Sequence, residues 1–531
     1  MALHTPSHPT QRAALMAQLA DARTYDVAII GGGATGLGVA LDAAARGFSV
    51  VLLESHDFAK GTSSRATKLV HGGVRYLAQG NVSLVREALH ERTTLLSNAP
   101  HLAQPLPFVM PSYHWWETPF YGVGLKMYDL LAGKAGIGPT EFLSKSRTLE
   151  LLPTAKPAGL TGGVKYWDGQ FDDARLALAL AKTAVRQGAL LVNYCAAKQL
   201  THEGGKVTGL TVQDRETDKL YAIKARCVIN AAGVWVDEFR QQDGQSMQRP
   251  VKAMVAPSQG VHIVIDREFF PGDHALLVPK TQDGRVLFAV PWLGKVILGT
   301  TDTPRNDLAR EPTPFAEEVQ FILSEAAKYF TRAPQRSDVK SIWVGLRPLV
   351  KPQDDDGGNT KALSREHTIL VSKSGLLTVT GGKWTTYRAM AEDVMTHAFE
   401  AQLLEAKKGG VTVHLPLVGA QPTSTRVSAP PGLHLYGSEA STVQSLPGAK
   451  HELGGAGVSG LIESMVRFAA RYEYARTVED VLARRSRLLF LDARLAARLA
   501  SEVAAILQEE TQMDPHLDAF MALAAQYTRL P

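Results

Sequence analysis

The stretch that decides the fold is Tyr25–Glu54, which reads YDVAIIGGGATGLGVALDAAARGFSVVLLE. Its first part, Val27–Ile30, is a short apolar run rich in β-branched residues and bounded by glycine, a pattern typical of a buried strand. The small and apolar residues that follow predict a helix, which ends at Gly47. Ser49–Leu53 predicts a second strand, so the stretch is expected to form a βαβ unit.

Three glycines between the first strand and the helix indicate a binding site. Gly31 allows a tight turn, Gly33 lets a pyrophosphate approach the backbone, and Gly36 lets the helix pack closely on the strand. At the start of the helix, Ala34 and Thr35 add unpaired N–H groups and the positive end of the helix dipole. The motif therefore predicts a dinucleotide site; an ordinary βαβ unit is the alternative.

The second strand ends on an acidic residue, Glu54, about 20 residues after the glycines. Its carboxylate can accept hydrogen bonds from both ribose hydroxyls of an adenosine, and its charge would repel a 2′-phosphate. The unit lies near the N-terminus of a long chain and is not repeated. This position favours FAD over a nicotinamide coenzyme.

The composition excludes several classes of protein. The 531 residues allow two or three domains, and the 45% hydrophobic and 21% charged content is that of a soluble globular protein. A net charge of +5 is too small to indicate nucleic-acid binding, although it suits an anionic substrate or membrane surface. Cys195 and Cys227 stand apart from any Cys/His cluster, so we expect neither a disulfide framework nor a metal site.

Membrane-spanning and targeting segments are not expected. No apolar run reaches the length of about 18 residues that a spanning helix needs. Residues 1–24 lack the apolar core of a signal peptide. If the protein contacts a membrane, we expect it to lie on the surface.

A polar loop follows the βαβ unit. Residues 61–76 read GTSSRATKLVHGGVRY and contain many hydrogen-bond donors. Ser63, Ser64 and Lys68 could donate to a phosphate or to the edge of an isoalloxazine ring. The alternative is a solvated loop that leads into a helix over Val82–Leu96.

Later segments extend the predicted sheet and site. Val228–Asn230 and Leu376–Thr380 read as buried strands. Gly381 and Gly382 then open onto a helix over Thr385–Phe399, which predicts a second anion site by the same dipole argument. Several short runs within residues 251–298, separated by turns, predict an antiparallel sheet in a substrate domain.

In two regions the sequence pattern gives a weaker prediction of structure. Residues 100–160 are rich in proline and aromatic residues. The prolines argue against a continuous helix, and the aromatic residues suit packed core, which we expect, or a membrane-contacting belt.

From about Gly454 the chain reads as helical, with Thr477 and Asp492 as caps. We expect its basic residues to form a solvated face: Arg484, Arg485, Arg487, Arg494 and Arg498.

Six motifs together resemble the respiratory, FAD-dependent glycerol-3-phosphate dehydrogenase family. They are SSRATKLVHGGVRYL from Ser63, DDARL from Asp172, INAAGVW from Ile229, GTTDT from Gly299, GLRPL from Gly345 and GGKWTTYR from Gly381. The resemblance covers roughly residues 25–395. A further motif, LARRSRLLF from Leu482, resembles the helical cap of the same family less sharply.

The resemblance implies an α/β fold. It consists of a Rossmann-like FAD-binding domain of the glutathione-reductase and amino-acid-oxidase type, an antiparallel β substrate domain and a C-terminal α-helical cap domain. The expected segments are an N-terminal extension (1–24), a discontinuous FAD-binding domain (25–100, 160–245 and 340–400), a substrate-binding domain (101–159 and 246–339), a linker (401–453) and the helical domain (454–531).

The activity that the resemblance implies is oxidation of sn-glycerol 3-phosphate to dihydroxyacetone phosphate, with electrons passed through FAD to a membrane quinone. The implied partners are a small phosphorylated polyol, the quinone and a peripherally contacted membrane surface, with a homodimer as an option. The implied location is cytoplasmic, at the inner face of a bacterial cell membrane. Three alternatives stay open: an oxidase that uses O₂, an amine or amino-acid oxidase on the same fold, and a flavin-binding module without turnover.

The same resemblance names the residues of the site. Arginine suits a phosphate because its guanidinium binds two oxygens and keeps its charge. The expected substrate-binding residues are Arg75, Tyr76, Arg347, Lys383 and Thr385. The expected cofactor-binding residues are Gly31, Gly33, Ala34, Thr35, Gly36, Glu54, Thr62, Ser63, Ser64, Lys68, Leu69, His71, Gly72, Ala232, Gly233, Trp235, Asp302, Arg347, Gly382, Lys383, Trp384 and Thr385.

The catalytic residues implied are His262, Arg347, Lys383 and His71. Oxidation of an alcohol needs a base for the hydroxyl proton, and histidine titrates near neutrality. Alternation along the strand Val261–Ile265 places His262 on the face opposite its apolar neighbours. The choice between a core histidine and a catalytic base stays open at this point.

Overall fold

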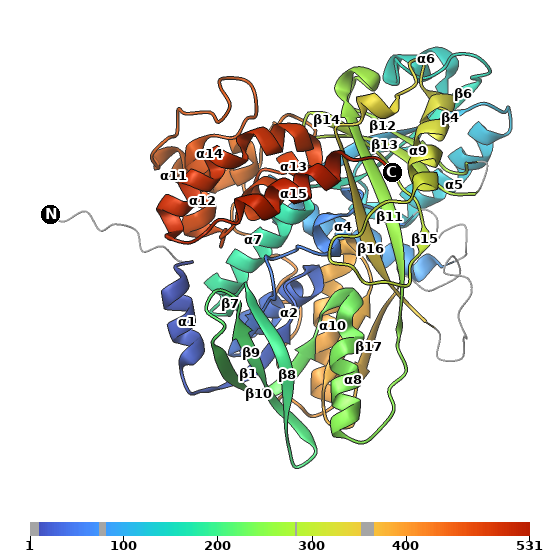
Figure 1. The fold of residues 1–531 in the computed structure, drawn as a ribbon. Coiled ribbons are helices and arrows are strands. Elements are labelled where there is room, and N and C mark those ends of the chain that lie inside the picture. Colours follow the sequence, from blue (N-terminus) through green and yellow to red (C-terminus); the bar gives the residue numbers. More distant parts are fainter. Residues whose placement is uncertain (1–9, 74–80, 282–283, 352–365) are drawn as a thin grey trace.

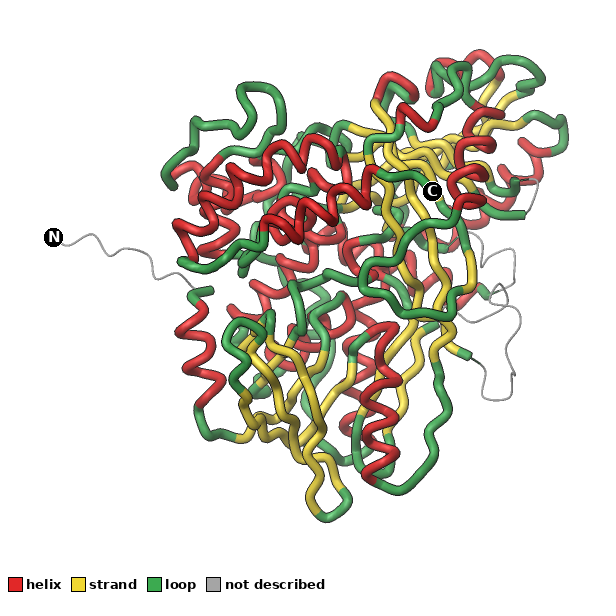
Figure 2. The backbone as a smooth tube through the Cα atoms, viewed as in Figure 1, coloured by secondary structure: helices red, strands yellow, loops and turns green. Residues whose placement is uncertain are grey.

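Two β-sheets form the framework of the computed structural model (Figure 1), which describes residues 10–73, 81–281, 284–351 and 366–531. Helices cover the first sheet, and a separate group of helices, formed by the C-terminal part of the chain, lies to one side (Figures 1 and 2). Arg75 and Tyr76 lie outside the described residues.

The first sheet contains the βαβ unit. It has eight strands among the described residues, and its main path runs β17-β18-β10-β1-β2-β7. β1 pairs in parallel with both β10 and β2, and β10 pairs in parallel with β18. The strands are β1 (Thr24–Ile30), β2 (Val50–Leu53), β7 (Leu190–Val192), β8 (Cys195–Glu203), β9 (Lys206–Asp214), β10 (Leu220–Asn230), β17 (His367–Val371) and β18 (Leu377–Gly381).

Helix α2, which is rich in glycine and alanine, packs closely on neighbouring helices of this sheet. α2 contacts both α7 and α10. Gly38 of α2 shows how close the approach is, since a Cβ there would lie 3.0 Å from the ring of Tyr387. The helices are α1 (Arg12–Ala20), α2 (Ala34–Ala45), α7 (Asp173–Arg186), α8 (Val236–Ser246) and α10 (Tyr387–Glu400).

The second sheet has ten strands among the described residues, with the main path β15-β11-β14-β13-β12-β4-β6-β3. Its pairings are antiparallel apart from β12 with β4, which is parallel. The strands are β3 (Leu69–Val70), β4 (Ala103–Ser112), β5 (Glu141–Ser144), β6 (Gly162–Phe171), β11 (Val255–Asp266), β12 (Ala275–Val278), β13 (Leu287–Trp292), β14 (Lys295–Gly299), β15 (Thr303–Pro304) and β16 (Ser341–Val350).

Three strands of this sheet, β3, β6 and β16, fall in segments that the sequence assigned to the FAD-binding domain. β6 pairs along its length with β4, and β16 pairs along its length with β11. β3 lies within a quoted motif, β16 contains another, and β6 ends just before the motif that starts at Asp172. The order of the motifs along the chain therefore placed these strands in the nucleotide-binding segments.

The proline-rich region contains a helix that the sequence did not predict. α5 spans Glu117–Ala132 without interruption. Its proline, Pro119, lies in the first turn, where a missing N–H costs no intrahelical hydrogen bond. The expectation of packed core was also wrong for Trp115, which is 82% exposed. The other helices of this half are α4 (Val82–Asn98), α6 (Lys145–Leu151) and α9 (Ala316–Tyr329).

The C-terminal region is helical, as expected. Asp492 Oδ1 accepts a hydrogen bond from the N–H of Leu495 at 3.0 Å, and Thr477 Oγ1 accepts one from the N–H of Asp480 at 3.2 Å, so both predicted caps are confirmed. Asp480–Arg485 forms a π-helical turn. The helices are α11 (Ala440–Ser445), α12 (Glu463–Tyr472), α13 (Leu488–Leu491), α14 (Ala493–Thr511) and α15 (Leu517–Thr528).

Three of the five C-terminal arginines are buried, so the expected solvated face was wrong for them. Arg484 and Arg485 both bind the carboxylate of Asp57, which follows β2, and Arg487 binds Asp173 at 3.0 Å. Acidic partners distant in sequence make this burial tolerable. Arg494 and Arg498 are exposed, as expected.

Candidate functional site

The glycine motif forms the turn between β1 and α2, and each of its glycines has a distinct environment. Gly31 has φ +107°, and a Cβ there would lie 2.5 Å from the carbonyl oxygen of Ala231. At Gly36 a Cβ would lie 1.9 Å from the carbonyl oxygen of Gly31. At Gly33 it would meet only Ser63 Oγ, at 3.0 Å. The backbone at Gly33 is therefore the open one, as a pyrophosphate needs.

Glu54 lies beside this turn, where an adenosine ribose would be held. Its Oε2 accepts the N–H of Gly32 at 2.7 Å, and its Oε1 accepts the N–H of His56 at 2.9 Å. These two bonds hold the carboxylate at the end of β2. Together with the open backbone at Gly33, the position of this acid fits a dinucleotide with an unphosphorylated ribose.

The loop after β2 contacts the motif through a serine. Ser63 Oγ accepts the N–H of Ala34 at 2.9 Å, at the first turn of α2. Thr62 Oγ1 donates to the carbonyl of Leu346 in β16. The loop is thereby held between the two sheets, next to the N-terminus of α2, with Thr35 in the same helical turn.

Lys68 does not have the role that the sequence predicted. Its ammonium is completely buried, where it donates to Asp173 Oδ2 at 2.7 Å and to the carbonyl of Ser64 at 2.8 Å. The side chain is therefore unavailable as a donor to a cofactor. Leu69 is likewise buried, in β3. The sequence shows a lysine among polar residues, but not the distant aspartate that draws it inward.

The ends of β10 and β18 complete the same edge of the sheet. Gly233 follows β10 with φ +62°, and a Cβ there would meet nothing within 4 Å. It lies between Ala232 and Trp235, whose indole N–H donates to the carbonyl of Leu308 at 3.1 Å. The open space at Gly233 is a second place where a ligand can approach the backbone.

The motif after β18 is bonded to the loop after β2. The indole N–H of Trp384 donates to the carbonyl of Ser63 at 2.9 Å, and Thr385 Oγ1 donates to the carbonyl of His71 at 3.3 Å. Gly382, with φ +75°, precedes Lys383 at this turn. Three segments far apart in the chain therefore meet where the parallel strands end, the usual location of a nucleotide site.

Gly72 connects this loop to a buried charged group. Its N–H donates to Asp168 Oδ1 at 3.2 Å, and the same oxygen accepts from Arg92 at 2.9 Å. Tyr128 of α5 donates to Asp168 Oδ2 at 3.2 Å. Burial raises the pKa of Tyr128 well above its ordinary value, so its hydroxyl stays protonated.

Arg347 is fixed as a cation on β16. Its Nη1 lies 3.2 Å from Asp302 Oδ1, and its Nη2 donates to the carbonyl of Thr301 at 2.9 Å. A Cβ on Gly260 would lie 2.4 Å from the guanidinium, so only glycine leaves room for it. The Nη1 of Arg347 also donates to the carbonyl of Gln259 and its Nη2 to Thr300 Oγ1, both at 3.2 Å, and 24% of the side chain stays exposed.

His262 of β11 is packed between the sheet and the loop. Its ring stacks on Trp343 with centroids 5.2 Å apart, and its Nε2 forms a 3.0 Å hydrogen bond with Thr67 Oγ1. Burial, with smaller contributions from Lys68 and Arg347, lowers the pKa of His262 well below its ordinary value. The imidazole is therefore neutral at physiological pH, and it holds the loop in place whether or not it accepts a proton.

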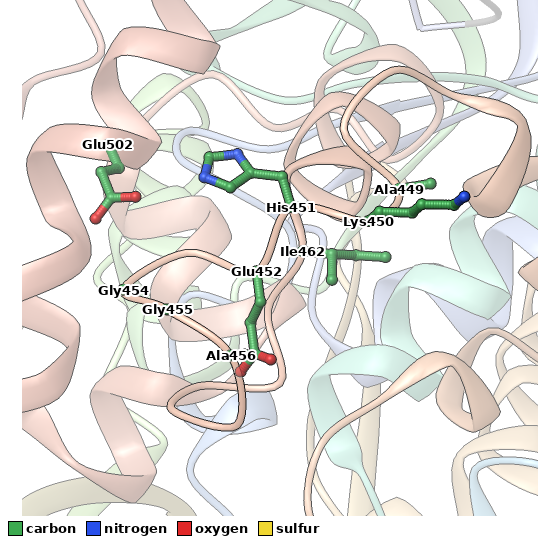
Figure 3. Close-up of a pocket in the computed structure, with 9 residues that line it drawn as sticks. All are labelled: Ala449, Lys450, His451, Glu452, Gly454, Gly455, Ala456, Ile462 and Glu502. Carbon is green, nitrogen blue, oxygen red and sulfur yellow. The ribbon is translucent and has the colours of Figure 1, made fainter.

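A separate hollow lies in the C-terminal domain (Figure 3). It has a volume of about 540 Å³ and is lined by Lys450, His451, Glu452 and Glu502 among others. The carboxylate of Glu452 already accepts N–H groups of Gly457, Ser459 and Gly460, at 2.8 Å each. None of the predicted site residues lines this hollow.

Sequence reasoning missed several residues that position the site. Asp173 binds Lys68 and Arg487, Asp57 binds two arginines, and Thr67 binds His262. Asp173 and Arg487 stand within the quoted motifs DDARL and LARRSRLLF, so their presence in two specific motifs was a usable signal. Thr67 carried none beyond its place in the loop. Within the described residues, no cluster of His, Cys, Asp and Glu is suited to a metal ion.

Comparison with known proteins agrees with this geometry. The profile of the FAD dependent oxidoreductase family matches residues 26–388, and that of the C-terminal domain of alpha-glycerophosphate oxidase matches residues 410–517. The mitochondrial glycerol-3-phosphate dehydrogenase of Macaca fascicularis is 41% identical to this chain over 545 residues, which cover 96% of this chain and 73% of that protein. That of Schizosaccharomyces pombe is 39% identical, with 95% and 87% covered.

Solved structures lead to the same group. The glycerol-3-phosphate dehydrogenase from Bacillus halodurans, solved in complex with FAD, superposes with a TM-score of 0.77 over 98% of each chain, at 29% identity. The expected α/β fold with a helical C-terminal domain is confirmed, and FAD is the cofactor of the family. Motifs, fold and relatives agree that this chain belongs to the FAD-dependent glycerol-3-phosphate dehydrogenase family.

Proposed function

We propose that this protein oxidises sn-glycerol 3-phosphate to dihydroxyacetone phosphate and passes the electrons to a membrane quinone. The observation that carries the proposal is the guanidinium of Arg347, which Asp302 and Thr301 help to hold in one position and whose side chain is 24% exposed. A cation held in this way supplies a positive charge at a fixed position, which suits an anionic substrate.

The residues at the strand ends would hold the FAD. The open backbone at Gly33 and the N-terminus of α2 would hold the pyrophosphate, and Glu54 would hold the adenosine ribose. Ser63, Trp384 and Thr385 connect the loops around this edge. When bound, FAD supplies the acceptor for the hydride of the alcohol carbon.

Arg347 would anchor the phosphate, with Lys383 as a second cation and Thr385 as a polar neighbour. Arg75 and Tyr76 complete the proposed substrate residues, outside the described part of the chain. For Arg347→Ala we expect the KM for glycerol 3-phosphate to rise at least about tenfold, because a charge-assisted pair is worth about 1.5–3 kcal/mol. The FAD content is measured by absorbance in parallel so that KM is compared at equal flavin loading, and an unchanged KM would remove Arg347 from the substrate site.

Two histidines are candidates for the base. His262 is neutral and bonded to Thr67, and His71 lies in the loop that contacts Thr385. Loss of a general base lowers the rate about 10²–10⁴-fold, whereas loss of a packing residue lowers stability instead. Anaerobic stopped-flow reduction of the flavin in His262→Asn and His71→Asn separates the two.

The membrane and the acceptor belong to the same proposal. In the described part of the chain, no helix is both long and apolar enough to cross a bilayer. We propose a peripheral position on a quinone-containing membrane. Two of the relatives named above are mitochondrial proteins and the third is from Bacillus halodurans, so the proposal does not specify a bacterial membrane.

The test of the activity is anaerobic mixing of the yellow protein with glycerol 3-phosphate, glycerol and a neutral amino acid in turn. We expect the flavin absorbance to bleach only with glycerol 3-phosphate. Bleaching by the amino acid would favour an amino-acid oxidase, and no bleaching at all would contradict the proposal. An O₂-using oxidase is separated by comparing the peroxide yield with the rate of quinone reduction.

A further inference from the structure

The segment between β15 and α9, residues 305–315, lies against the nucleotide edge of the first sheet. The indole N–H of Trp235, which follows β10, donates to the carbonyl of Leu308 in this segment at 3.1 Å. The guanidinium carbon of Arg310 lies 3.7 Å from the centre of the same indole ring. An arginine over an aromatic face makes a favourable cation–π contact. The 305–315 segment therefore brings a cation close to Gly233, where the backbone is open to a ligand.

The 305–315 segment is also bonded to the loop after β2. Arg65 Nη1 donates to the carbonyl of Arg310 at 3.3 Å, and Arg65 Nη2 donates to Glu311 Oε1 at 2.6 Å. In the same loop, a Cβ on Gly61 would lie 3.3 Å from the ring of Trp235. These contacts hold the backbone of Arg310 in one position relative to the loop after β2 and the end of β10.

The side chain of Arg310 has no acidic partner in the part of the chain that the structure describes. It is exposed, and no described carboxylate forms an ion pair with its guanidinium. Arg332 shows the ordinary arrangement of a stacked arginine: it lies 4.2 Å over the ring of Phe269 and also pairs with Glu268 at 2.8 Å. Arg310 differs because its planar cation is stacked in place and available to an anion from outside the chain.

Two acids of the nucleotide edge lie within electrostatic reach of Arg310. Partial desolvation lowers the pKa of Arg310, and the charges of Glu238 and Glu54 act in the opposite direction. The carboxylate of Glu54, at the end of β2, is already bonded to the N–H groups of Gly32 and His56. The guanidinium therefore lies near the proposed ribose site, but no acid of that site forms an ion pair with it.

The histidine that follows β2 lies in the same positive field. Burial lowers the pKa of His56 to about 3, with further contributions in the same direction from Arg215, Lys60 and Arg310. The imidazole is therefore neutral at physiological pH. Three cations thus act on this end of β2, which makes the approach to it attractive to a phosphorylated ligand.

The glycine turn itself contains no side-chain cation. Residues 31–35, GGGAT, contribute backbone N–H groups and the N-terminus of α2, whose dipole is equivalent to about half an elementary charge. Each phosphate of a diphosphate carries a full negative charge. The turn alone therefore neutralises a bound diphosphate only in part, and a side-chain cation from another segment would complete the site.

We propose that Arg310 binds the diphosphate of FAD, so that the 305–315 segment contributes a side-chain cation to the nucleotide site. Trp235 and Arg65 are the positioning residues, because one holds the guanidinium and the other holds the backbone of Arg310. FAD is the cofactor of the family, so the inference is independent of the proposed substrate and electron acceptor.

The test measures FAD release from the full-length holoenzyme, as the rise in flavin fluorescence when the protein is diluted. We expect Arg310→Gln to raise the dissociation constant of FAD about tenfold or more in low salt, because a charge-assisted bond is lost. At about 1 M salt, where the screening length is only about 3 Å, the difference between the two proteins should shrink severalfold. Arg332→Gln, at the other stacked arginine, should release FAD like the wild type. Circular dichroism checks that both variants are folded.

ADP and adenosine are then added as competitors of FAD, in order to separate the phosphates from the rest of the nucleotide. In Arg310→Gln we expect the inhibition constant of ADP to rise about tenfold and that of adenosine to stay unchanged. An unchanged dissociation constant for FAD would overturn the proposal. So would equal weakening of ADP and adenosine, which would assign Arg310 to the adenosine instead of the diphosphate.

Discussion

Lys68 Nζ lies 2.7 Å from Asp173 Oδ2, and both side chains are completely buried. Desolvation lowers the pKa of Lys68 to about 7, although the charge of Asp173 acts in the opposite direction. The rings of Trp292, Trp343 and Phe490 lie 5.1 to 5.5 Å from the ammonium. Arg487, from the C-terminal domain, binds the other oxygen of Asp173. The Lys68–Asp173 pair therefore joins the loop of residues 62–68 to α7 and, through Arg487, to the C-terminal domain.

We expect Lys68→Met to destabilise the protein by about 3–5 kcal/mol, because the charge of Asp173 loses its closest partner. The loop that carries Ser63 should loosen with it, so the variant should also retain less FAD. Urea unfolding and the ratio of flavin to protein absorbance measure the two effects. Lys198→Met, at an exposed site, is the control, with an expected change below about 0.5 kcal/mol; equal values for the two variants would refute the structural role.

Asp57 offers a comparison between a buried and an exposed ion pair. It binds Arg484 and Arg485 in the interior, and Asp57→Asn would leave both guanidinium groups undercompensated. We expect a loss of about 3–5 kcal/mol. In the control pair both side chains are about 60% exposed, Arg332 with Glu268, so Glu268→Gln should cost less than about 0.5 kcal/mol. Chemical unfolding of both variants shows whether burial of the ion pair accounts for the difference in the free energy of unfolding.

The glycine motif should separate folding from cofactor binding. Gly36→Ala places a Cβ 1.9 Å from the carbonyl oxygen of Gly31, so we expect poor folding and little soluble protein. At Gly33 the same change meets only Ser63 Oγ, at 3.0 Å. Gly33→Ala should therefore fold but bind FAD weakly, because the added methyl group occupies the pyrophosphate path. Circular dichroism and FAD titration report the two outcomes, and a Gly33→Ala protein with normal FAD affinity would contradict the assignment.

His262 should make the folded state sensitive to acid. Its pKa is lowered in the folded protein, whereas the unfolded chain has the ordinary value of about 6.5. As the pH falls below about 6.5, the unfolded state binds a proton that the folded state does not, so stability is lost. We expect the wild type to lose stability relative to His262→Asn between pH 7 and pH 5. Thermal unfolding of both proteins across that range is the measurement, and parallel curves would mean that His262 titrates normally.

The local parts of the fold were predictable from the sequence. The caps at Thr477 and Asp492 depend on residues three positions apart, and the contact of Glu54 with Gly32 within the βαβ unit spans 22 positions. Their signals are propensity, glycine geometry and short-range hydrogen bonds. The family resemblance supplied the rest of the expected site, including Arg347.

The errors share a physical cause, which is the partner that a linear sequence does not show. Arg484 is charged and was expected in solvent, yet Asp57 from the other end of the chain makes its burial possible. Lys68 was expected at the cofactor and is held by Asp173 instead. Trp115 was expected in the core, although nothing in the described chain covers it. Each depends on long-range packing rather than on its neighbours in sequence.

The side-by-side arrangement of β1, β10 and β18 has a consequence for synthesis of the protein. These strands come from the beginning, the middle and the last third of the chain, yet their ends form one nucleotide edge. The ribosome must therefore translate past residue 382 before all three strand ends of the nucleotide site have been synthesised. A truncated product that ends before β17 would keep the glycine fingerprint but lack the strand and turn opposite it. We therefore expect such fragments to lack a complete flavin site, even though they contain the glycine motif.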